Sequence, residues 1–335
     1  MSTSKYRIVS LDGGGVRGLV TAIMLQAIQK HFEANGENFL DSVDFLAGTS
    51  TGGLLALAIA KDIKLLDRMK DIYANESKSI FEKASFKSSG GFLATKYTNE
   101  PLDKKLYEIF GDMRLEDLSK KVLLPTFDLD NDSDNPESRH WKPKLFHNFP
   151  PDKAKQENNE DQNHTVVEVG LYTTAAPTFF PSVKGYIDGG VYANNPSMCA
   201  IAQTQDQRYH ARTGATDSRV SLDNIVMLSL GTGLNLQHLR HHTIKRGILR
   251  WIQPLIQIIF DGTTGIGDYQ CKQLLNEHQY RRLNPTFIGK NNKPKYVAMD
   301  ATSPKKIAYM IQIAESYTQS NEFRDTLDWM GQHWF

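Results

Sequence analysis

Two glycine-rich turns, each between an apolar segment and a helical pattern, constrain the fold of this 335-residue chain more than any other feature. The apolar segment "YRIVSL" (6–11) leads into "DGGGVRG" (12–18), and "VDFLA" (43–47) leads into "GTSTGG" (48–53). Short β-branched runs of this kind are typical of buried strands, and apolar residues at helical spacing follow each turn. Two successive strand–turn–helix units predict an α/β fold with a largely parallel central sheet.

Later segments supply further expected strands. "VLLPTFDLD" (122–130) reads as a strand in which Pro125 suggests a sheet edge or a bulge, and "KLFHNF" (144–149) is a candidate partner for it. "GYIDGGVYANNP" (185–196) predicts a strand, a turn and the start of a helix. "NIVMLSLGTG" (224–233) is the last clear buried strand, and the remainder of the chain is expected to be mainly helical.

Composition argues against several classes of protein. The formal net charge of +1 gives no basic field for nucleic acid. Two cysteines, Cys199 and Cys271, are too few for a disulfide framework, and no Cys/His cluster has zinc spacing. The N-terminus has no apolar signal-peptide region, and no apolar run approaches the ~20 residues of a membrane-spanning helix. We expect a cytoplasmic protein without a metal or other cofactor, able to contact membranes only peripherally.

The turn "GTSTGG" contains the spacing Gly-x-Ser-x-Gly, formed by Gly48, Ser50 and Gly52. This spacing places a serine on a sharp strand-to-helix turn with its hydroxyl exposed above the sheet. A serine hydroxyl becomes an effective nucleophile only when a base accepts its proton. Ser50 is therefore a candidate nucleophile, and the chain must supply a base for it.

The first turn allows two interpretations. Gly13, Gly15 and Gly18 match the dinucleotide pattern Gly-x-Gly-x-x-Gly, which also needs an acidic residue at the end of the next strand. Glu33 and Glu37 lie at about that distance, but in a segment expected to be a helix end and a turn. The other interpretation is an oxyanion hole, because consecutive glycines expose backbone N–H groups beside the site. We favour the oxyanion hole, although any single glycine could serve tight packing only.

The base is expected to be a carboxylate rather than a histidine. The late histidines do not follow a clear strand with a turn motif: His210, His238, His241, His242, His278 and His333. Asp188 ends the strand in "YIDGG" and is followed by Gly189 and Gly190, which repeats the arrangement of the other two turns. Partial burial would raise the pKa of a carboxyl group toward the range of a useful base.

Together the three motifs resemble those of the patatin-like phospholipases. The matching segments are "DGGGVRG", "GTSTGG" and "DGG" in family order, supported by "TTAAPTFFP" (173–181) and "SLGTG" (229–233). The resemblance implies a three-layer α/β/α fold and a Ser–Asp dyad of Ser50 and Asp188. It also implies an oxyanion loop of Gly13, Gly14, Gly15, Val16 and Arg17, and no metal. For Arg17 two roles stay open, contact with a lipid phosphate or oxyanion and a salt bridge that anchors the loop.

The expected function is hydrolysis of fatty-acyl esters, in phospholipids, lysophospholipids or neutral lipids. We expect a catalytic domain over residues 5–233 and a mainly helical extension over 234–335 that packs on the same domain. The alternatives are a dinucleotide-binding protein and a storage protein with incidental esterase activity. The resemblance also admits toxins and defence effectors switched on by cyclic nucleotides. The sequence leaves the biological setting, the lipid head group and the oligomeric state open.

A basic and apolar segment, "ILRWIQPLIQIIF" (248–260), is a candidate for membrane contact. Ile248, Ile252, Leu255 and Ile259 are spaced close to one helical face, flanked by Trp251 and by basic residues. Such a face can dock onto anionic lipid. The alternative is an ordinary helix packed on the domain, broken at Pro254.

Overall fold

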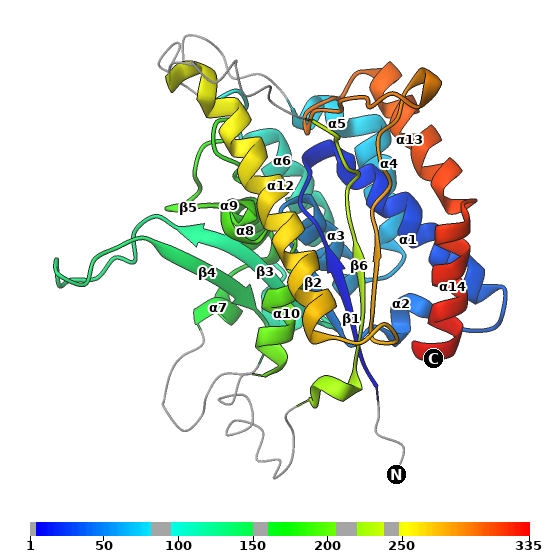
Figure 1. Ribbon diagram of the computed structural model, residues 1–335. Helices are drawn as coiled ribbons and strands as arrows, with labels where there is room; N and C mark the ends of the chain where they lie inside the picture. Colours follow the sequence, from blue (N-terminus) through cyan, green and yellow to red (C-terminus); the bar gives the residue numbers. More distant parts are fainter. Residues whose placement is uncertain (1–4, 82–94, 150–159, 206–219, 238–247) are drawn as a thin grey trace.

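A seven-stranded sheet with helices on both faces organises the described part of the chain (Figure 1). The computed structural model describes residues 5–81, 95–149, 160–205, 220–237 and 248–335. The main strand order is β4-β3-β2-β1-β6-β7, and β5 pairs with β3. The strands are β1 (Tyr6–Leu11), β2 (Phe45–Gly48), β3 (Lys121–Asp128), β4 (Lys142–His147), β5 (Tyr186–Asp188), β6 (Ile225–Leu230) and β7 (Tyr280–Leu283).

The register of the parallel strands brings the motif loops together. Strand β1 lies between β2 and β6 and is parallel to both, with Leu11 opposite Gly48 on one side and Leu230 on the other. These three residues are the last of their strands. The turns that begin at Asp12, Thr49 and Gly231 therefore leave the same edge of the sheet, which is where ligands bind in open α/β folds.

Alternating apolar side chains explain why both faces of the sheet are covered. In β1 the fully buried Ile8 packs into one hydrophobic core and its neighbour Val9 into the other. Helices α10 (Ser197–Thr204) and α12 (Ile248–Leu274) supply the core on the Ile8 face. This gives the three-layer α/β/α arrangement, with α12 crossing in front of the sheet in Figure 1.

The core on the Val9 face is formed by a larger group of helices. They are α1 (Gly18–Glu33), α2 (Phe39–Ser42), α3 (Thr51–Lys61), α4 (Leu65–Asp71), α5 (Ser77–Ile80), α6 (Glu100–Phe110), α8 (Val166–Thr174), α13 (Pro304–Thr318) and α14 (Asn321–His333). The short helices α7 (Glu160–Asn163) and α9 (Gly190–Ala193) follow β4 and β5 in the chain. Among the described residues, no helix is both long enough and apolar enough to cross a membrane.

The sequence predicts that Pro125 marks either a sheet edge or a bulge. The prediction of an edge is wrong, because β3 has neighbouring strands on both sides. Parallel pairing with β2 ends at Leu123, and antiparallel pairing with β5 on that side begins at Thr126. Pro125 falls in the gap between the two partners, where its missing N–H is not needed. The expected pairing of β3 with the segment around residues 144–149 is confirmed, since β4 is antiparallel to β3.

One strand was not expected from the sequence. Strand β7 has the sequence "YRRL" and extends the sheet beyond β6 in parallel register. Two arginines in four residues hide the apolar pattern of a buried strand, and only Tyr280 and Leu283 of the four are buried. Residues after 234 thus contribute a strand to the central sheet as well as helices. How residues 5–233 and 234–335 divide into domains stays a prediction.

The alternative given for the segment 248–260 is correct in that the helix packs on the domain, but wrong in that Pro254 does not break it. Helix α12 continues from Ile248 to Leu274 with Pro254 inside it. The proline comes seven residues into the helix, so that only one early backbone hydrogen bond is lost while a long C-terminal portion packs on α9 and α10. Packing along that portion sustains the helix through the proline.

Candidate active site

Ser50 occupies the sharp turn that its motif predicts, between the end of β2 and the start of α3. Its backbone has φ 53° and ψ −123°, a conformation that costs a non-glycine residue roughly 1–3 kcal/mol. Gly52 permits the turn, because a Cβ there would lie 2.2 Å from the carbonyl oxygen of Leu11. The turn is held in place by the Ser50 N–H, which donates to Thr173 Oγ1 at 2.9 Å.

Thr173 is a site residue whose role the sequence did not reveal, although it begins the supporting segment "TTAAPTFFP". Its buried hydroxyl accepts from the Ser50 N–H and donates to the carbonyl of Pro125 at 2.8 Å. The hydroxyl therefore links the serine turn to strand β3. The proline gap in β3 leaves this carbonyl free of β2 and available to Thr173.

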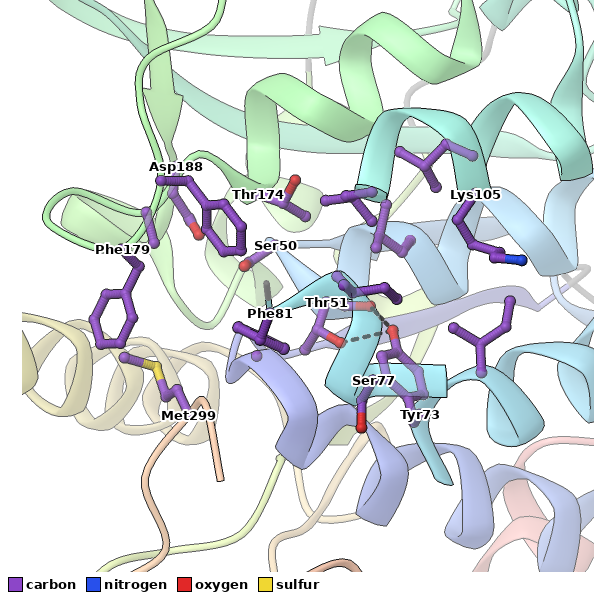
Figure 2. A pocket seen from close by; sticks show the side chains of 18 of the residues that line it. Ser50, Thr51, Tyr73, Ser77, Phe81, Lys105, Thr174, Phe179, Asp188 and Met299 are labelled. Atoms are coloured by element: carbon purple, nitrogen blue, oxygen red, sulfur yellow. Dashed lines mark hydrogen bonds between the residues drawn. The ribbon is translucent and has the colours of Figure 1, made fainter. Parts of the chain in front are cut away.

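Asp188 lies at the end of β5 and is completely buried. Its Oδ1 accepts the N–H of Gly190 at 2.8 Å, while Oδ2 has no hydrogen bond of good geometry from any described residue. Figure 2 shows the Ser50 hydroxyl and the Asp188 carboxylate turned toward one another. Burial raises the pKa of Asp188 to about 7, against the opposing effects of the Gly190 N–H and the Ser50 hydroxyl.

The strand that carries Asp188 has a direction that the sequence did not predict. Asp188 ends its strand, as expected, but β5 runs antiparallel to β3, with Asp188 opposite Thr126. Asp188 therefore reaches the site from a short strand that continues beyond β2 on the same side of β3. A hydrogen bond links the serine turn to the helix that follows Asp188, because the Thr49 hydroxyl donates to the carbonyl of Ala193 at 2.6 Å.

The glycine loop offers fewer free N–H groups than the motif suggests. The N–H of Gly13 donates to the Asn194 carbonyl at 3.0 Å, and the N–H of Val16 donates to the Met299 carbonyl at 2.8 Å. The N–H of Arg17 donates back to the Gly14 carbonyl at 3.3 Å. Within this loop, only the N–H groups of Gly14 and Gly15 have no acceptor among the described residues. The expectation that Gly13, Val16 and Arg17 offer free backbone N–H groups is therefore corrected, because these three groups already donate to carbonyl oxygens.

Of the two roles left open for Arg17, the described residues do not show the salt bridge, and contact with a lipid phosphate or oxyanion stays a prediction. Its buried guanidinium forms no ion pair within the described residues. It donates from Nε to the Gly14 carbonyl at 3.3 Å and from Nη1 to the Gly233 carbonyl at 3.4 Å. Arg17 is also not among the residues that line the cavity containing Ser50. It anchors the glycine loop through backbone carbonyls instead of through a salt bridge.

The sequence also did not predict an ion pair that lies behind the glycine loop. Arg282 of β7 donates to both carboxylate oxygens of Asp12, and its Nη1 also donates to Ser229 Oγ at 2.6 Å. Both charged side chains are almost fully buried. A buried pair of this kind fixes the first residue of "DGGGVRG" from a strand near the other end of the sequence.

Ser50 and Asp188 meet at one end of an apolar cavity (Figure 2). Lys105 lies at the opposite end of the cavity in the figure. Its walls are mostly aliphatic and aromatic, with Leu54, Ile72, Leu102, Leu106 and Phe180 among them. An apolar lining next to a nucleophile matches the chemistry of a fatty-acyl chain.

A π-helical turn, Ile72–Glu76, forms part of the cavity wall between α4 and α5. The Thr51 hydroxyl donates to Tyr73 Oη at 2.6 Å, and Tyr73 Oη donates to the Thr51 carbonyl at 3.1 Å (Figure 2, dashed lines). π-Bulges are frequent at functional sites because they redirect side chains. Here the bulge directs a buried tyrosine onto the residue that follows Ser50.

No histidine lines the cavity within the described part of the chain. The rings of His278 and His333 lie near one another, with centroids 5.9 Å apart and planes tilted by 51°. His210, His238, His241 and His242 lie outside the described residues. Among the residues that the structure describes, no group of three or more His, Cys, Asp and Glu side chains could hold a metal ion.

Comparison with known proteins identifies the family of this chain. The family model described as "Patatin-like phospholipase" matches residues 9–201. Patatin-like protein 4 of Arabidopsis thaliana is 27% identical over 96% of this chain and 85% of its own length. The 85/88 kDa calcium-independent phospholipase A2 of Mus musculus is 31% identical over 70% of this chain and 28% of its own length. The crystal structure of VipD from Legionella pneumophila has a TM-score of 0.36 and 12% identity, covering 94% of this chain and 67% of that one. The chain belongs to the patatin-like phospholipase family.

Proposed function

We propose that this protein hydrolyses fatty-acyl esters of lipids, with Ser50 as the nucleophile and Asp188 as the general base. One observation carries the proposal, namely that these two side chains face each other at the end of an apolar cavity. The strained backbone of Ser50 and the raised pKa of Asp188 support it, because both are properties of groups prepared for reaction.

The reaction would proceed through an acyl-enzyme. Asp188 accepts the Ser50 proton as the oxygen attacks the ester carbonyl, and the Gly14 and Gly15 N–H groups donate to the resulting oxyanion. The protonated Asp188 then gives its proton to the departing alcohol. In the second half, Asp188 accepts a proton from water, which attacks the acyl-enzyme and releases the fatty acid. The regenerated Ser50 hydroxyl recovers its proton from Asp188.

The substrate class follows from the cavity. An apolar space of this kind favours a long acyl chain over an acetyl group, because each methylene buried gains about 0.8 kcal/mol. We propose a phospholipase A or lysophospholipase type of activity, in line with the family. The cavity itself selects the acyl chain, and it does not select one head group.

The dinucleotide-binding alternative is not favoured. Protein atoms already pack against Gly13 and Gly15, where a dinucleotide would have to approach the backbone. A Cβ would lie 2.2 Å from Asn194 Oδ1 at Gly13 and 2.3 Å from the Met299 carbonyl at Gly15. Glu33 ends helix α1 and Glu37 is an exposed residue after it, so neither follows a strand as a ribose ligand must. A storage or effector protein would differ from a metabolic enzyme only in biological setting.

A lipid-release assay tests the proposal directly. Fatty acid released from a long-chain phospholipid or lysophospholipid is measured for the wild type and for Ser50→Ala. Long-chain esters should be cleaved at a higher kcat/KM than the corresponding acetyl esters. Equal release by both proteins, or a preference for the acetyl ester, would contradict the proposal.

The activity should depend on pH through Asp188. A base must be ionised to accept the serine proton, and burial raises the pKa of Asp188 to about 7. We therefore expect kcat/KM to be constant above about pH 7 and to fall tenfold per pH unit below it. The measurement is a kcat/KM profile between about pH 5 and 9. A profile that is flat through pH 7, in a protein that remains folded, would contradict the assignment.

Peripheral membrane contact stays a prediction, with a corrected set of residues. Leu255 is 47% and Ile258 48% exposed on α12, whereas Ile259 is half-buried. The side chains of Ile248 and Ile252 lie outside the described residues.

We expect the double substitution Trp251→Ala with Leu255→Ser to weaken co-sedimentation with anionic vesicles by about tenfold, because both residues can insert at the lipid surface. Leu274→Ser is a matched control, since Leu274 is 52% exposed at the far end of the same helix. If the double variant binds vesicles as the wild type does, this part of α12 is not the anchor.

A further inference from the structure

The carbonyl oxygen of Gly13 is held from two sides by buried side chains. Thr232 Oγ1 donates to it at 3.0 Å, and Asn194 Nδ2 donates to it at 3.4 Å. Neither residue belongs to the three motifs with expected catalytic roles. Thr232 follows β6, and Asn194 follows the short helix α9.

The direction of this carbonyl determines the direction of the next N–H group. In a trans peptide the C=O and the following N–H point in opposite directions within one plane. With the Gly13 oxygen turned toward Thr232 and Asn194, the Gly14 N–H must face away from them. The Gly14 amide has no described partner, and its neighbour Gly15 lines the cavity with Ser50 and Asp188.

A peptide between two glycines is easily turned over unless something holds it. Glycine adopts positive and negative φ with similar ease, so rotation on both sides of the Gly13–Gly14 peptide meets little steric resistance. A reversed peptide would present a carbonyl oxygen where an oxyanion needs a donor. The two bonds to the Gly13 oxygen oppose that reversal.

Thr232 is itself rigidly placed. The neighbouring residue Gly231 donates its N–H to the Leu283 carbonyl at 2.8 Å and accepts the Thr21 hydroxyl at 2.9 Å. On the other side, the Gly233 N–H donates to Asn284 Oδ1 at 2.9 Å. A hydroxyl anchored in this way can restrain the peptide that it contacts.

The side-chain amide of Asn194 also indicates that the Gly13 carbonyl is held in place, because one of its polar atoms has no hydrogen bond. Its Nδ2 donates to Gly13 and to Thr264 Oγ1, while its buried Oδ1 has no partner among the described residues. A buried amide oxygen without a hydrogen bond is unfavourable and calls for an explanation. Holding the Gly13 carbonyl provides one.

We propose that Thr232, assisted by Asn194, is a positioning residue that keeps the Gly14 N–H aimed at the oxyanion formed on the ester. The inference rests on the proposed hydrolase function, and it concerns the "SLGTG" segment, to which no role was assigned. Thr232 acts through the Gly13–Gly14 peptide and does not itself contact the reacting atoms.

The test compares two substitutions at one position. Thr232→Val preserves the side-chain shape but removes the donor, whereas Thr232→Ser keeps the hydroxyl and loses a methyl group. Loss of an entire oxyanion donor typically lowers kcat by about 100–1000-fold. Because Asn194 remains, we expect Thr232→Val to lower kcat by about 10- to 100-fold with KM changed less than about twofold. Thr232→Ser should retain kcat within about threefold of the wild type.

A matched control separates this effect from the loss of any buried hydrogen bond. Thr204→Val removes a buried threonine hydroxyl that donates to the Ile201 carbonyl in α10, and it should not change kcat. Equal losses in Thr232→Val and Thr232→Ser would show that keeping the hydroxyl does not preserve kcat, and would overturn the inference. So would an unchanged kcat in Thr232→Val, or a change confined to KM. If Ser50→Ala is inactive while Thr232→Val is fully active, this inference alone fails. If Ser50→Ala stays active, the proposed function fails.

Discussion

Replacing Ser50 by alanine is expected to remove lipid release, by about 10⁴-fold or more relative to the wild type. The loss should be this large because no acyl-enzyme can form without the Ser50 oxygen, and water would have to attack the ester directly. A fluorophosphonate probe should label Ser50 in the wild type and leave the Ser50→Ala protein unlabelled. Labelling is located by mass spectrometry of the digested protein.

The folded state should tolerate this substitution. Alanine at position 50 keeps the same strained backbone, so the melting temperature should stay near that of the wild type. Ser119→Ala is a suitable control, because Ser119 donates to the carbonyl of Ala60 near the opposite end of α3. That variant should still be labelled at Ser50. Labelling at another residue, or equal labelling of Ser50→Ala, would show that Ser50 is not the nucleophile.

Asp188→Asn is expected to lower kcat by at least the ~100-fold typical of losing a general base, while stabilising the fold above neutral pH. Asparagine keeps the shape of aspartate, and its oxygen can still accept the Gly190 N–H, but it cannot take the serine proton. The stability effect has a separate cause, because the wild type must keep a buried carboxylate ionised above about pH 7.

The sign of the stability effect follows from the direction of the pKa shift. The pKa of Asp188 is raised from 3.8 to about 7 on folding, so the folded state holds this proton more tightly than the unfolded chain does. The wild type therefore loses stability as pH rises from 3.8 to 7, by roughly 4 kcal/mol from this group at most. The amide avoids that loss. Asp188→Asn should melt at a higher temperature than the wild type at pH about 8, and the two should converge near pH 4.

The histidines provide the control for the identity of the base. His278 and His333 are not among the residues that line the cavity, and the other four candidates lie outside the described residues. Each single histidine substitution, at positions 210, 238, 241, 242, 278 and 333, should leave substantial activity. A folded histidine variant as inactive as Ser50→Ala would indicate an ordinary triad in which Asp188 only orients the histidine.

The sequence by itself determined the fold class, the family and the identity of the two facing side chains. Apolar periodicity and glycine spacing are local properties, and a strand, a sharp turn and a helix form within one short stretch such as residues 43–61. For this reason the turn at Ser50 and the end of β5 at Asp188 could be placed from their own motifs. The same local reading failed at β7, where Arg281 and Arg282 hide a strand that is recognisable only from its pairing with β6.

Only the tertiary structure decided which groups of the motif loops remain free. The motif offered several loop amides as oxyanion donors, but the carbonyls of Asn194 and Met299 occupy those of Gly13 and Val16. The Gly13 carbonyl is oriented by Thr232, 219 residues away in the sequence, and Asp12 by Arg282, 270 residues away. A backbone amide looks the same in any glycine loop, and its availability depends on the partner that folding brings to it. Parallel strands bring together the ends of segments far apart in the chain, so these partners are fixed by register and packing and not by local sequence.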